Sequence, residues 1–155
     1  MEEQFNKIFE LYNKDVYRLI FSYTMDYSEA KDILQETFLR YYKNMDKLPE
    51  DHVDVKKWLF KVSINISKDY LRRIIKYRFF YKDELEQYKS NEKNDLDFID
   101  ILERLNIKYR IPIFLYYYEG YKIEEIAELL NMKVSAVKMR LSRAKIILKK
   151  EMESI

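Results

Sequence analysis

The sequence predicts an all-helical protein of two small domains, and three observations support this prediction. Apolar residues recur at steps of three and four along most of the 155 residues, which is the spacing of an amphipathic helix. The chain has one Gly and two Pro, so strands joined by tight turns would lack their usual turn residues. Residues 79–94 lose the periodicity and are rich in Lys, Glu, Gln and Asn, a composition typical of a solvated linker.

The first domain, residues 1–78, is predicted to contain three helices. The first has an apolar stripe from Phe5 to Tyr23, and the second begins after Ser28, a residue type that accepts hydrogen bonds at helix N-termini. Pro49 separates the second helix from a third, because proline interrupts helical pairing. The third helix has an apolar stripe of Trp58, Leu59, Val62, Ile66, Tyr70 and Leu71. Trp58 is interpreted as a core aromatic, since its neighbours continue this stripe.

The second predicted helix has two distinct faces. Its buried stripe is expected to consist of Ala30, Ile33, Leu34, Thr37 and Tyr41, and its opposite face of Asp32, Gln35, Glu36, Leu39 and Lys43. A single exposed leucine is ordinary on a protein surface. Leu39 surrounded by polar residues also has the composition of a protein-docking face, and both interpretations stay open from the residues alone.

The second domain, residues 95–155, is predicted to contain four helices, near residues 95–105, 107–119 and 122–130 and from residue 134 onward. Gly120 stands where a helix would end in the left-handed conformation. The last helix is basic: residues 131–145 include five basic residues and no acidic one, although the net charge of the chain is only +2. Its apolar stripe is Val134, Val137, Leu141, Ala144 and Leu148.

The outward face of this basic helix predicts contact with nucleic acid. It carries Ser135, Lys138, Met139, Arg140, Ser142 and Arg143. The preceding helix contains the small Ala127 and is joined to it by three residues, which is a helix-turn-helix pattern. Lys122 and Lys133 stand at the two helix starts, where a cation opposes the helix dipole unless an anion binds there. The pattern favours DNA binding over a basic helix that only aids solubility or contacts an acidic partner.

Composition excludes most catalytic chemistries. The absence of Cys and the presence of one His, His52, exclude disulfides, thiolate catalysis and His-based metal clusters. A single Gly excludes glycine-rich phosphate loops. No apolar run approaches the roughly 20 residues of a membrane span, and the first residues are acidic and polar, so we expect a cytoplasmic protein with no membrane insertion. No motif requires a metal or cofactor, and we expect none.

Three segments resemble bacterial RNA polymerase sigma factors of the sigma-70 family, extracytoplasmic-function (ECF) group. They are SEAKDILQETFLRYYKN, VKKWLFKVSINISKDYLRR and YRIPIFLYYYEGYKIEEIAELLNMKVSAVKMRLSRAKIILKK, in the order expected for that family. The resemblance implies a region 2-like helical bundle over residues 1–78, a linker over 79–94 and a region 4-like helix-turn-helix domain over 95–155. It implies a non-catalytic initiation subunit that binds core RNA polymerase and recognises the minus-ten and minus-thirty-five promoter elements.

The resemblance also implies site residues and partners. Core polymerase binding falls on Asp32, Gln35, Glu36 and Leu39. Binding of the melted non-template strand of the minus-ten element falls on Asn65, Lys68, Asp69, Arg72 and Arg73, with Asn65 helping to form the pocket for a flipped base. Binding of the minus-thirty-five duplex falls on Lys122, Lys133, Ser135, Lys138, Met139, Arg140, Ser142 and Arg143, of which Arg143 is the best candidate for a guanine edge. An anti-sigma protein is a further expected partner.

The chain departs from the family at three of these positions. Lys122 and Lys133 stand where Ser or Thr is usual, and Met139 is apolar where a polar residue is common. Two rival functions fit the residues less well than the resemblance does. A helix-turn-helix repressor or activator would leave the Leu39 face and residues 65–73 unexplained. An enzyme with carboxylate-bound metal is disfavoured, because the acidic residues lie on solvated helix faces with basic neighbours.

Overall fold

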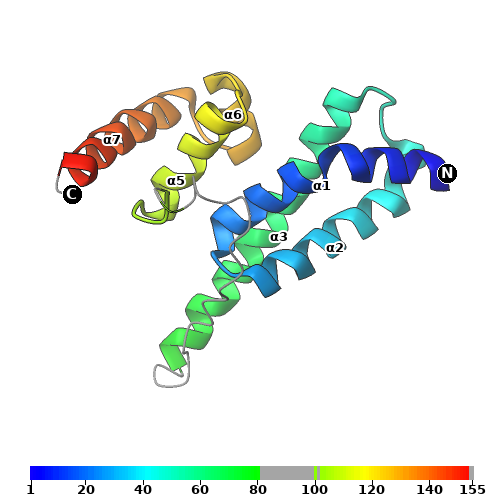
Figure 1. Ribbon diagram of the computed structural model, residues 1–155, viewed down its shortest axis with the longest axis horizontal. Helices are drawn as coiled ribbons and strands as arrows, with labels where there is room; N and C mark the ends of the chain where they lie inside the picture. The colour runs from blue at the N-terminus through cyan, green and yellow to red at the C-terminus, as the bar shows by residue number, and fades with distance from the viewer. Residues whose placement is uncertain (81–99, 101, 154–155) are drawn as a thin grey trace. The chain divides into compact units, whose positions relative to one another are not determined.

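The computed structural model describes residues 1–80, 100 and 102–153, and all regular structure within these residues is helical (Figure 1). Contacts divide the chain into two units, Met1–Glu92 and Lys93–Ile155. The predicted all-helical class with two helical domains is confirmed. Residues 79 and 80 of the predicted linker belong to the third helix, and residues 81–94 lie outside the described residues.

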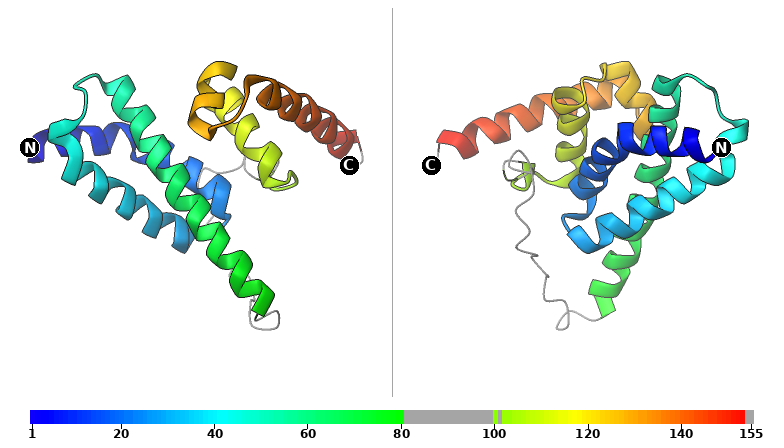
Figure 2. Two further views of the ribbon diagram at one scale, coloured as in Figure 1. Left: turned by 180° about the vertical axis from the view of Figure 1, so that it is seen from behind. Right: turned by 45° about the vertical axis from the view of Figure 1, so that its right-hand side comes forward.

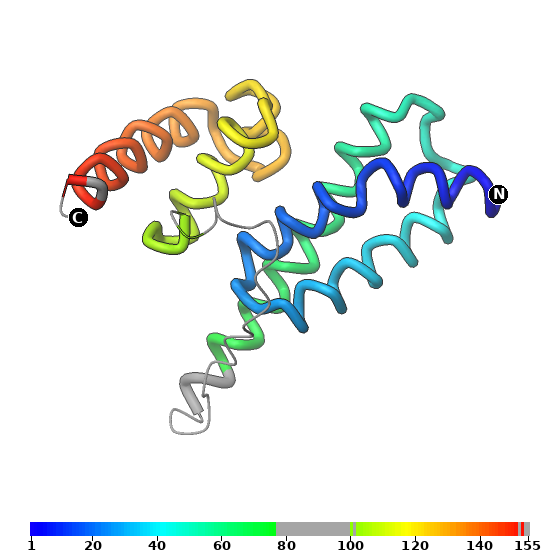
Figure 3. Tube along the Cα trace, in the orientation of Figure 1, coloured from blue at the N-terminus to red at the C-terminus, as the bar shows by residue number. Residues whose placement is uncertain are grey.

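The first unit is a bundle of α1 (Glu2–Thr24), α2 (Tyr27–Asn44) and α3 (His52–Phe80), with a short 3₁₀ turn η1 (Met45–Lys47) after α2. Each of the three long helices packs on the other two, and both views of Figure 2 show them side by side. Figure 3 shows the chain passing from α2 through η1 to the start of α3. The fully buried side chains of this core include Val16, Leu19 and Ile20 of α1, Tyr41 of α2 and Leu59, Phe60 and Ile64 of α3.

The start of α2 corrects one prediction. Asp26, not Ser28, is the N-cap: its backbone is extended and its carboxylate accepts a hydrogen bond from the N–H of Glu29 at 3.1 Å. Ser28 is already inside the helix. The cause is the preceding turn, in which Met25 adopts the left-handed conformation with φ 51° and donates its N–H to the carbonyl of Phe21. This turn reverses the chain two residues earlier than the sequence indicates.

The buried face of α2 is close to the prediction. Ala30, Ile33, Thr37 and Tyr41 are buried as expected, Leu34 is half-buried, and Phe38 is buried although it was not predicted to be. Phe38 is buried because its ring packs between aromatic rings of α1, with centroids 4.9 Å from Phe9 and 6.2 Å from Phe5. Such clusters bury large apolar areas in favourable ring geometries.

The buried face of α3 is wider than predicted. Leu59 and Ile66 are buried, whereas the other four residues of the predicted stripe are half-buried. Because α3 packs on both α1 and α2, a second set of residues is buried as well, namely Val55, Phe60, Ser63, Ile64 and Ser67. Trp58 is half-buried, with its ring 6.3 Å from that of Tyr41, which agrees with a packing role.

The second unit contains α5 (Ile107–Ile113), the π-helix η2 (Phe114–Tyr118), α6 (Ile123–Leu130) and α7 (Val134–Glu153). The predicted helix over 107–119 is thus present but changes to π geometry, with the N–H of Glu119 bonded to the carbonyl of Phe114. The change follows Pro112, which has no N–H to donate. Gly120 has φ 74°, as predicted for a helix end. The predicted helix near residues 95–105 lies mostly outside the described residues.

The N-cap correction gives a stability test. Asp26→Ala removes the hydrogen bond to Glu29 and should lower the free energy of unfolding of the first unit by about 1 kcal/mol. Ser28→Ala is the matched control and should change it by less than about 0.5 kcal/mol. Urea unfolding followed by the fluorescence of Trp58, the single tryptophan, measures both. An equal loss in the two variants would contradict the assignment.

Candidate nucleic-acid and protein-binding surfaces

The helix-turn-helix of the second unit has a tight turn between α6 and α7. Asn131 adopts the left-handed conformation with φ 53°, and the N–H of Met132 donates to the carbonyl of Ala127 at 2.8 Å. This is the hydrogen bond that closes a Schellman helix end. Ala127 is buried, and α6 packs against α7. The predicted helix, turn and helix are therefore present.

The two faces of α7 divide as predicted. Val137, Leu141 and Ala144 are buried, and Val134 and Leu148 are half-buried at the ends of the stripe. The exposed predicted residues are Ser135, Lys138, Met139, Ser142 and Arg143, and Arg140 is half-buried. No acidic residue occurs in residues 131–150. Through residue 150 the outward face of α7 therefore carries cations and no anions, which favours binding to a phosphate backbone.

Lysines stand at the starts of both helices. Lys122 is the N-cap of α6 and its N–H donates to the carboxylate of Glu125 at 3.2 Å, which is one half of a capping box. Lys133 directly precedes α7, and its carbonyl accepts the N–H groups of Ala136 and Val137. A lysine side chain has no acceptor, so neither residue can cap the helix N–H groups with its side chain. Two exposed ammonium groups beside helix N-termini form a pattern suited to anions.

The predicted protein-docking face of α2 is exposed. Asp32, Gln35, Glu36 and Leu39 are all exposed, and Leu39 keeps 48% of its surface accessible. Glu36 forms an ion pair with Arg40 at 3.0 Å, with both side chains about half exposed. Exposed pairs of this kind contribute little to stability. Breaking the Glu36–Arg40 pair to bind a partner would therefore cost little free energy.

The predicted strand-binding residues share one side of α3. Asn65, Asp69 and Arg72 are exposed at helical spacings of four and three, so they lie on one face. Arg72 donates to the carboxylate of Asp69 at 2.7 Å, an exposed pair. Arg73 is exposed and Lys68 is half-buried. The face offers an amide and cations, which are the groups that an unstacked base and its phosphates require.

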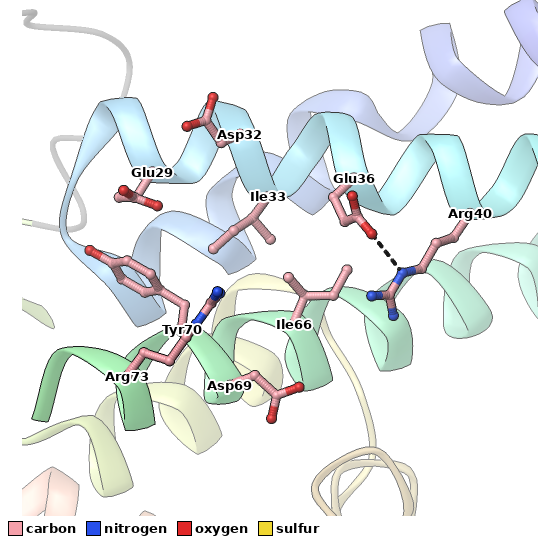
Figure 4. A pocket seen from close by; sticks show the side chains of 9 residues that line it. All are labelled: Glu29, Asp32, Ile33, Glu36, Arg40, Ile66, Asp69, Tyr70 and Arg73. Atoms are coloured by element: carbon pink, nitrogen blue, oxygen red, sulfur yellow. Dashed lines mark hydrogen bonds and ion pairs between the residues drawn. The ribbon is translucent and has the colours of Figure 1, made fainter. Parts of the chain in front are cut away.

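A depression between α2 and α3 brings together residues that the sequence assigned to separate roles (Figure 4). It has a volume of about 560 Å³. Asp32 and Glu36 of the docking face and Asp69 and Arg73 of the strand-binding face all line it, together with Glu29, Ile33, Arg40, Ile66 and Tyr70. Glu29 and Arg40 were not predicted to belong to a site, although each is one helical turn from Asp32 or Glu36.

Charge is uneven around this depression. Burial raises the pKa of Glu29, and the carboxylates of Asp26 and Asp32 raise it further. The guanidinium of Arg73, which belongs to α3, lowers the pKa of Glu29 in part. Negative charge therefore accumulates on the α2 wall near its N-terminus, and Arg73 is the group on the opposite wall that compensates it.

Membrane spans and metal-binding clusters are both absent from the described residues. None of the helices there has both the length and the apolar character needed to cross a membrane. In the same residues, no three His, Asp or Glu side chains are close enough together to hold a metal ion. The carboxylates of the α2–α3 depression do not form such a group.

Comparison with known proteins identifies the family of this chain. Residues 8–75 match the model for Sigma-70 region 2, and residues 95–148 match the model for Sigma-70, region 4. The RNA polymerase sigma factor SigV of Bacillus subtilis is 31% identical over 136 residues, which cover 86% of this chain and 81% of SigV. The ECF RNA polymerase sigma factor SigM of the same organism is 32% identical over 149 residues, 90% of each chain. The chain belongs to the ECF group of the sigma-70 family.

Solved structures agree with this fold. The sigma factor RpoE, in its complex with the anti-sigma factor NepR from Bartonella quintana, matches with a TM-score of 0.78 at 21% identity over 96% of each chain. CnrH, in complex with the cytosolic domain of CnrY, matches with a TM-score of 0.70 at 20% identity over 99% of this chain and 90% of CnrH. As an ECF sigma factor, the protein directs promoter-specific initiation of transcription by RNA polymerase.

The lysines at the helix starts give a second test. The double variant Lys122→Ser, Lys133→Ser supplies hydroxyl caps and should raise stability by about 1 kcal/mol per helix. If each lysine sits on a phosphate, the slope of log affinity against log salt should fall by about 0.9 per residue. Circular-dichroism melting and binding to duplex promoter DNA measure the two effects. Lys47→Ser, an exposed lysine of the first unit, is the charge control. A stabilised variant with unchanged affinity and salt slope would refute the phosphate contacts.

Proposed function

We propose that this sigma factor binds core RNA polymerase with the exposed face of α2 and binds promoter DNA with α3 and α7. The observation that carries the proposal is the outward face of α7, which is basic, has no acidic residue before residue 151 and directly follows a tight helix-turn-helix turn. Membership of the sigma-70 family supports the same division, because α1 to α3 belong to region 2 and α5 to α7 to region 4.

In this proposal α7 enters the major groove of the minus-thirty-five element. Arg143 donates two hydrogen bonds to a guanine edge, the commonest specific contact in that groove. Ser135, Lys138 and Ser142 lie on the same exposed face and contact bases and phosphates. Met139, 47% exposed, offers an apolar contact of the kind that a thymine methyl accepts. Lys122 and Lys133 bind DNA phosphates and so fix the position of α7 along the duplex.

In the first unit, α3 holds the melted non-template strand of the minus-ten element. Asn65 supplies amide hydrogen bonds to the edge of a flipped base. Lys68, Arg72 and Arg73 supply cations to the strand, whose binding depends on phosphate neutralisation. Asp69 orients Arg72 through their ion pair. Leu39 is the apolar centre of the separate docking face for core polymerase, with Asp32, Gln35 and Glu36 around it.

The proposal includes no catalytic step. The protein contributes binding energy to promoter opening and requires no metal or cofactor of its own. It acts in the cytoplasm, where polymerase and chromosome meet. An anti-sigma protein is a further proposed partner, and the support for it is that the similar sigma factor RpoE is seen bound to the anti-sigma factor NepR.

The docking face predicts loss of polymerase binding in Leu39→Asp. A carboxylate at the apolar centre would be buried unpaired in the interface, which is costly. Leu11→Asp is the matched control, because Leu11 is 49% exposed and Leu39 is 48% exposed. Association with purified core polymerase and promoter-directed transcription should fail for Leu39→Asp and persist for Leu11→Asp. Equal activity of both variants would exclude Leu39 from the interface.

The groove contact predicts a different defect in Arg143→Ala. This variant should bind core polymerase normally but lose about 1–3 kcal/mol of discrimination at one base pair of the upstream element. Arg104→Ala is the control, since Arg104 is an exposed cation of the same unit that pairs with Glu151. Transcription from promoters substituted in the upstream element reads out the difference. Tight DNA binding with no specific starts in the wild type would support a repressor instead.

A further inference from the structure

An aromatic side chain of α1 packs against an exposed tyrosine near the end of α2. The first turns of α1 lie beside the last turns of α2 in both views of Figure 2. The ring of Phe5 meets that of Tyr42 edge to face, with centroids 5.6 Å apart and an interplanar angle of 85°. Phe5 also contacts the rings of Phe38 and Tyr41, with centroids 6.2 and 6.0 Å away. The ring of Tyr42 is thus supported by α1 although it belongs to α2.

Tyr42 is nevertheless open to solvent. It keeps 47% of its surface accessible, almost the same fraction as Leu39 with 48%. In the same cluster Phe38 and Tyr41 are buried and Phe5 is half-buried. Aromatic residues are enriched at protein–protein interfaces, where a large ring packs against the partner. An exposed ring that is supported from one side therefore has the properties of a binding residue.

Tyr42 continues the predicted docking face of α2, to which it was not predicted to belong. Asp32, Gln35, Leu39 and Tyr42 follow one another at steps of three, four and three. At about 100° per residue, these positions fall within an arc of about 80° on the helix surface. Leu39 and Tyr42 are neighbours on that surface, because residues three apart lie one helical turn from each other. The apolar part of the face is therefore larger than Leu39 alone.

We propose that Tyr42 is a contact residue for core RNA polymerase and that Phe5 is the positioning residue that holds its ring. This inference rests on the proposed docking face of α2 and extends that face to the first turns of α1. The occupant follows from continuity, because a partner that covers Leu39 also reaches the exposed ring one helical turn away.

Two physical properties suit the pair to these roles. Tyrosine provides a large contact area with few rotatable bonds, and it is enriched among the residues that dominate the binding energy of interfaces. Aromatic pairs prefer edge-to-face geometry, so Phe5 favours one orientation of the Tyr42 ring. A side chain that is already oriented loses less rotamer freedom when a partner binds. Phe5 therefore contributes to polymerase affinity through Tyr42.

The first test compares Tyr42→Ala with Tyr42→Phe in the 155-residue chain. The affinity of each fluorescently labelled variant for purified core polymerase is measured by titration. Tyr42→Ala should weaken binding by about 30-fold or more, the loss typical of a dominant interface residue. Tyr42→Phe keeps the ring and its contact with Phe5, so it should bind nearly as tightly as the wild type.

Phe5→Leu tests the positioning role, and Phe9→Leu is the matched control. Phe5 and Phe9 are both half-buried on α1, their rings stack with centroids 6.3 Å apart, and both contact Phe38. Phe5, however, is the residue whose ring meets Tyr42. Phe5→Leu should weaken polymerase binding by about 2- to 12-fold, the value of one aromatic pair. Phe9→Leu should leave the affinity unchanged.

A double variant separates positioning from a general loss of packing. Phe5→Leu combined with Tyr42→Ala should bind no worse than Tyr42→Ala alone, because Phe5 acts through Tyr42. A further loss in the double variant would contradict the positioning role. Circular-dichroism melting verifies that each variant is folded at the temperature of the titration.

Full polymerase binding by Tyr42→Ala, with a loss in Leu39→Asp, overturns the inference and leaves the proposed docking face intact. Equal losses in Phe5→Leu and Phe9→Leu overturn the positioning role, because they indicate a general effect on packing. If Leu39→Asp and Tyr42→Ala both bind normally, the proposed face fails and the inference fails with it. Sedimentation checks one other occupant: a wild-type dimer that becomes monomeric in Tyr42→Ala, with unchanged polymerase binding, would assign the ring to a second copy of the chain.

Discussion

The buried stripe of each helix is the constraint on which the rest of the structure depends. Val137 and Ala144 are fully buried in the second unit and Leu141 nearly so, and this burial fixes the rotation of α7 about its own axis. A helix turns by about 100° per residue, so a shift of one position would carry the basic side chains toward the core. Burial of a charged group without a partner is strongly unfavourable, which excludes that register. The same packing that stabilises the unit therefore decides which side chains remain for DNA.

The faces of α2 and α7 could be predicted because a single apolar stripe decides which side of each helix is buried. Periodicity then indicates both the buried and the exposed residues. It predicted too narrow a core face for α3, which packs on two helices and buries Phe60 and Ile64 outside the predicted stripe. The start of α2 was predicted two residues too late, although Asp26 and Glu29 have the spacing of a helix N-terminus. The left-handed conformation of Met25 just before it, which non-glycine residues adopt infrequently, is the part that the sequence does not indicate.

The relation between the predicted sites could not be derived from the sequence at all. Each candidate residue was found on its own helix, whereas the α2–α3 depression depends on how the two helices pack, with Ile33 and Ile66 pointing toward each other between them. Contacts between helices follow from the shapes of many side chains together, whereas periodicity reports only one helix at a time. The structure thus adds relations among residues whose individual exposure was already expected.

The shared depression makes the two faces of the first unit electrostatically dependent on each other. Arg73 of the strand-binding face interacts with Glu29 on the opposite wall, and Asp32 of the docking face raises the pKa of the same carboxyl group. A protein that covers Asp32 and Glu36 would also exclude water from this depression. The attraction between Glu29 and Arg73 strengthens as the effective dielectric constant falls. Occupation of the predicted docking face by a partner would therefore change the field at the predicted strand-binding face of α3, because residues of both faces line one depression.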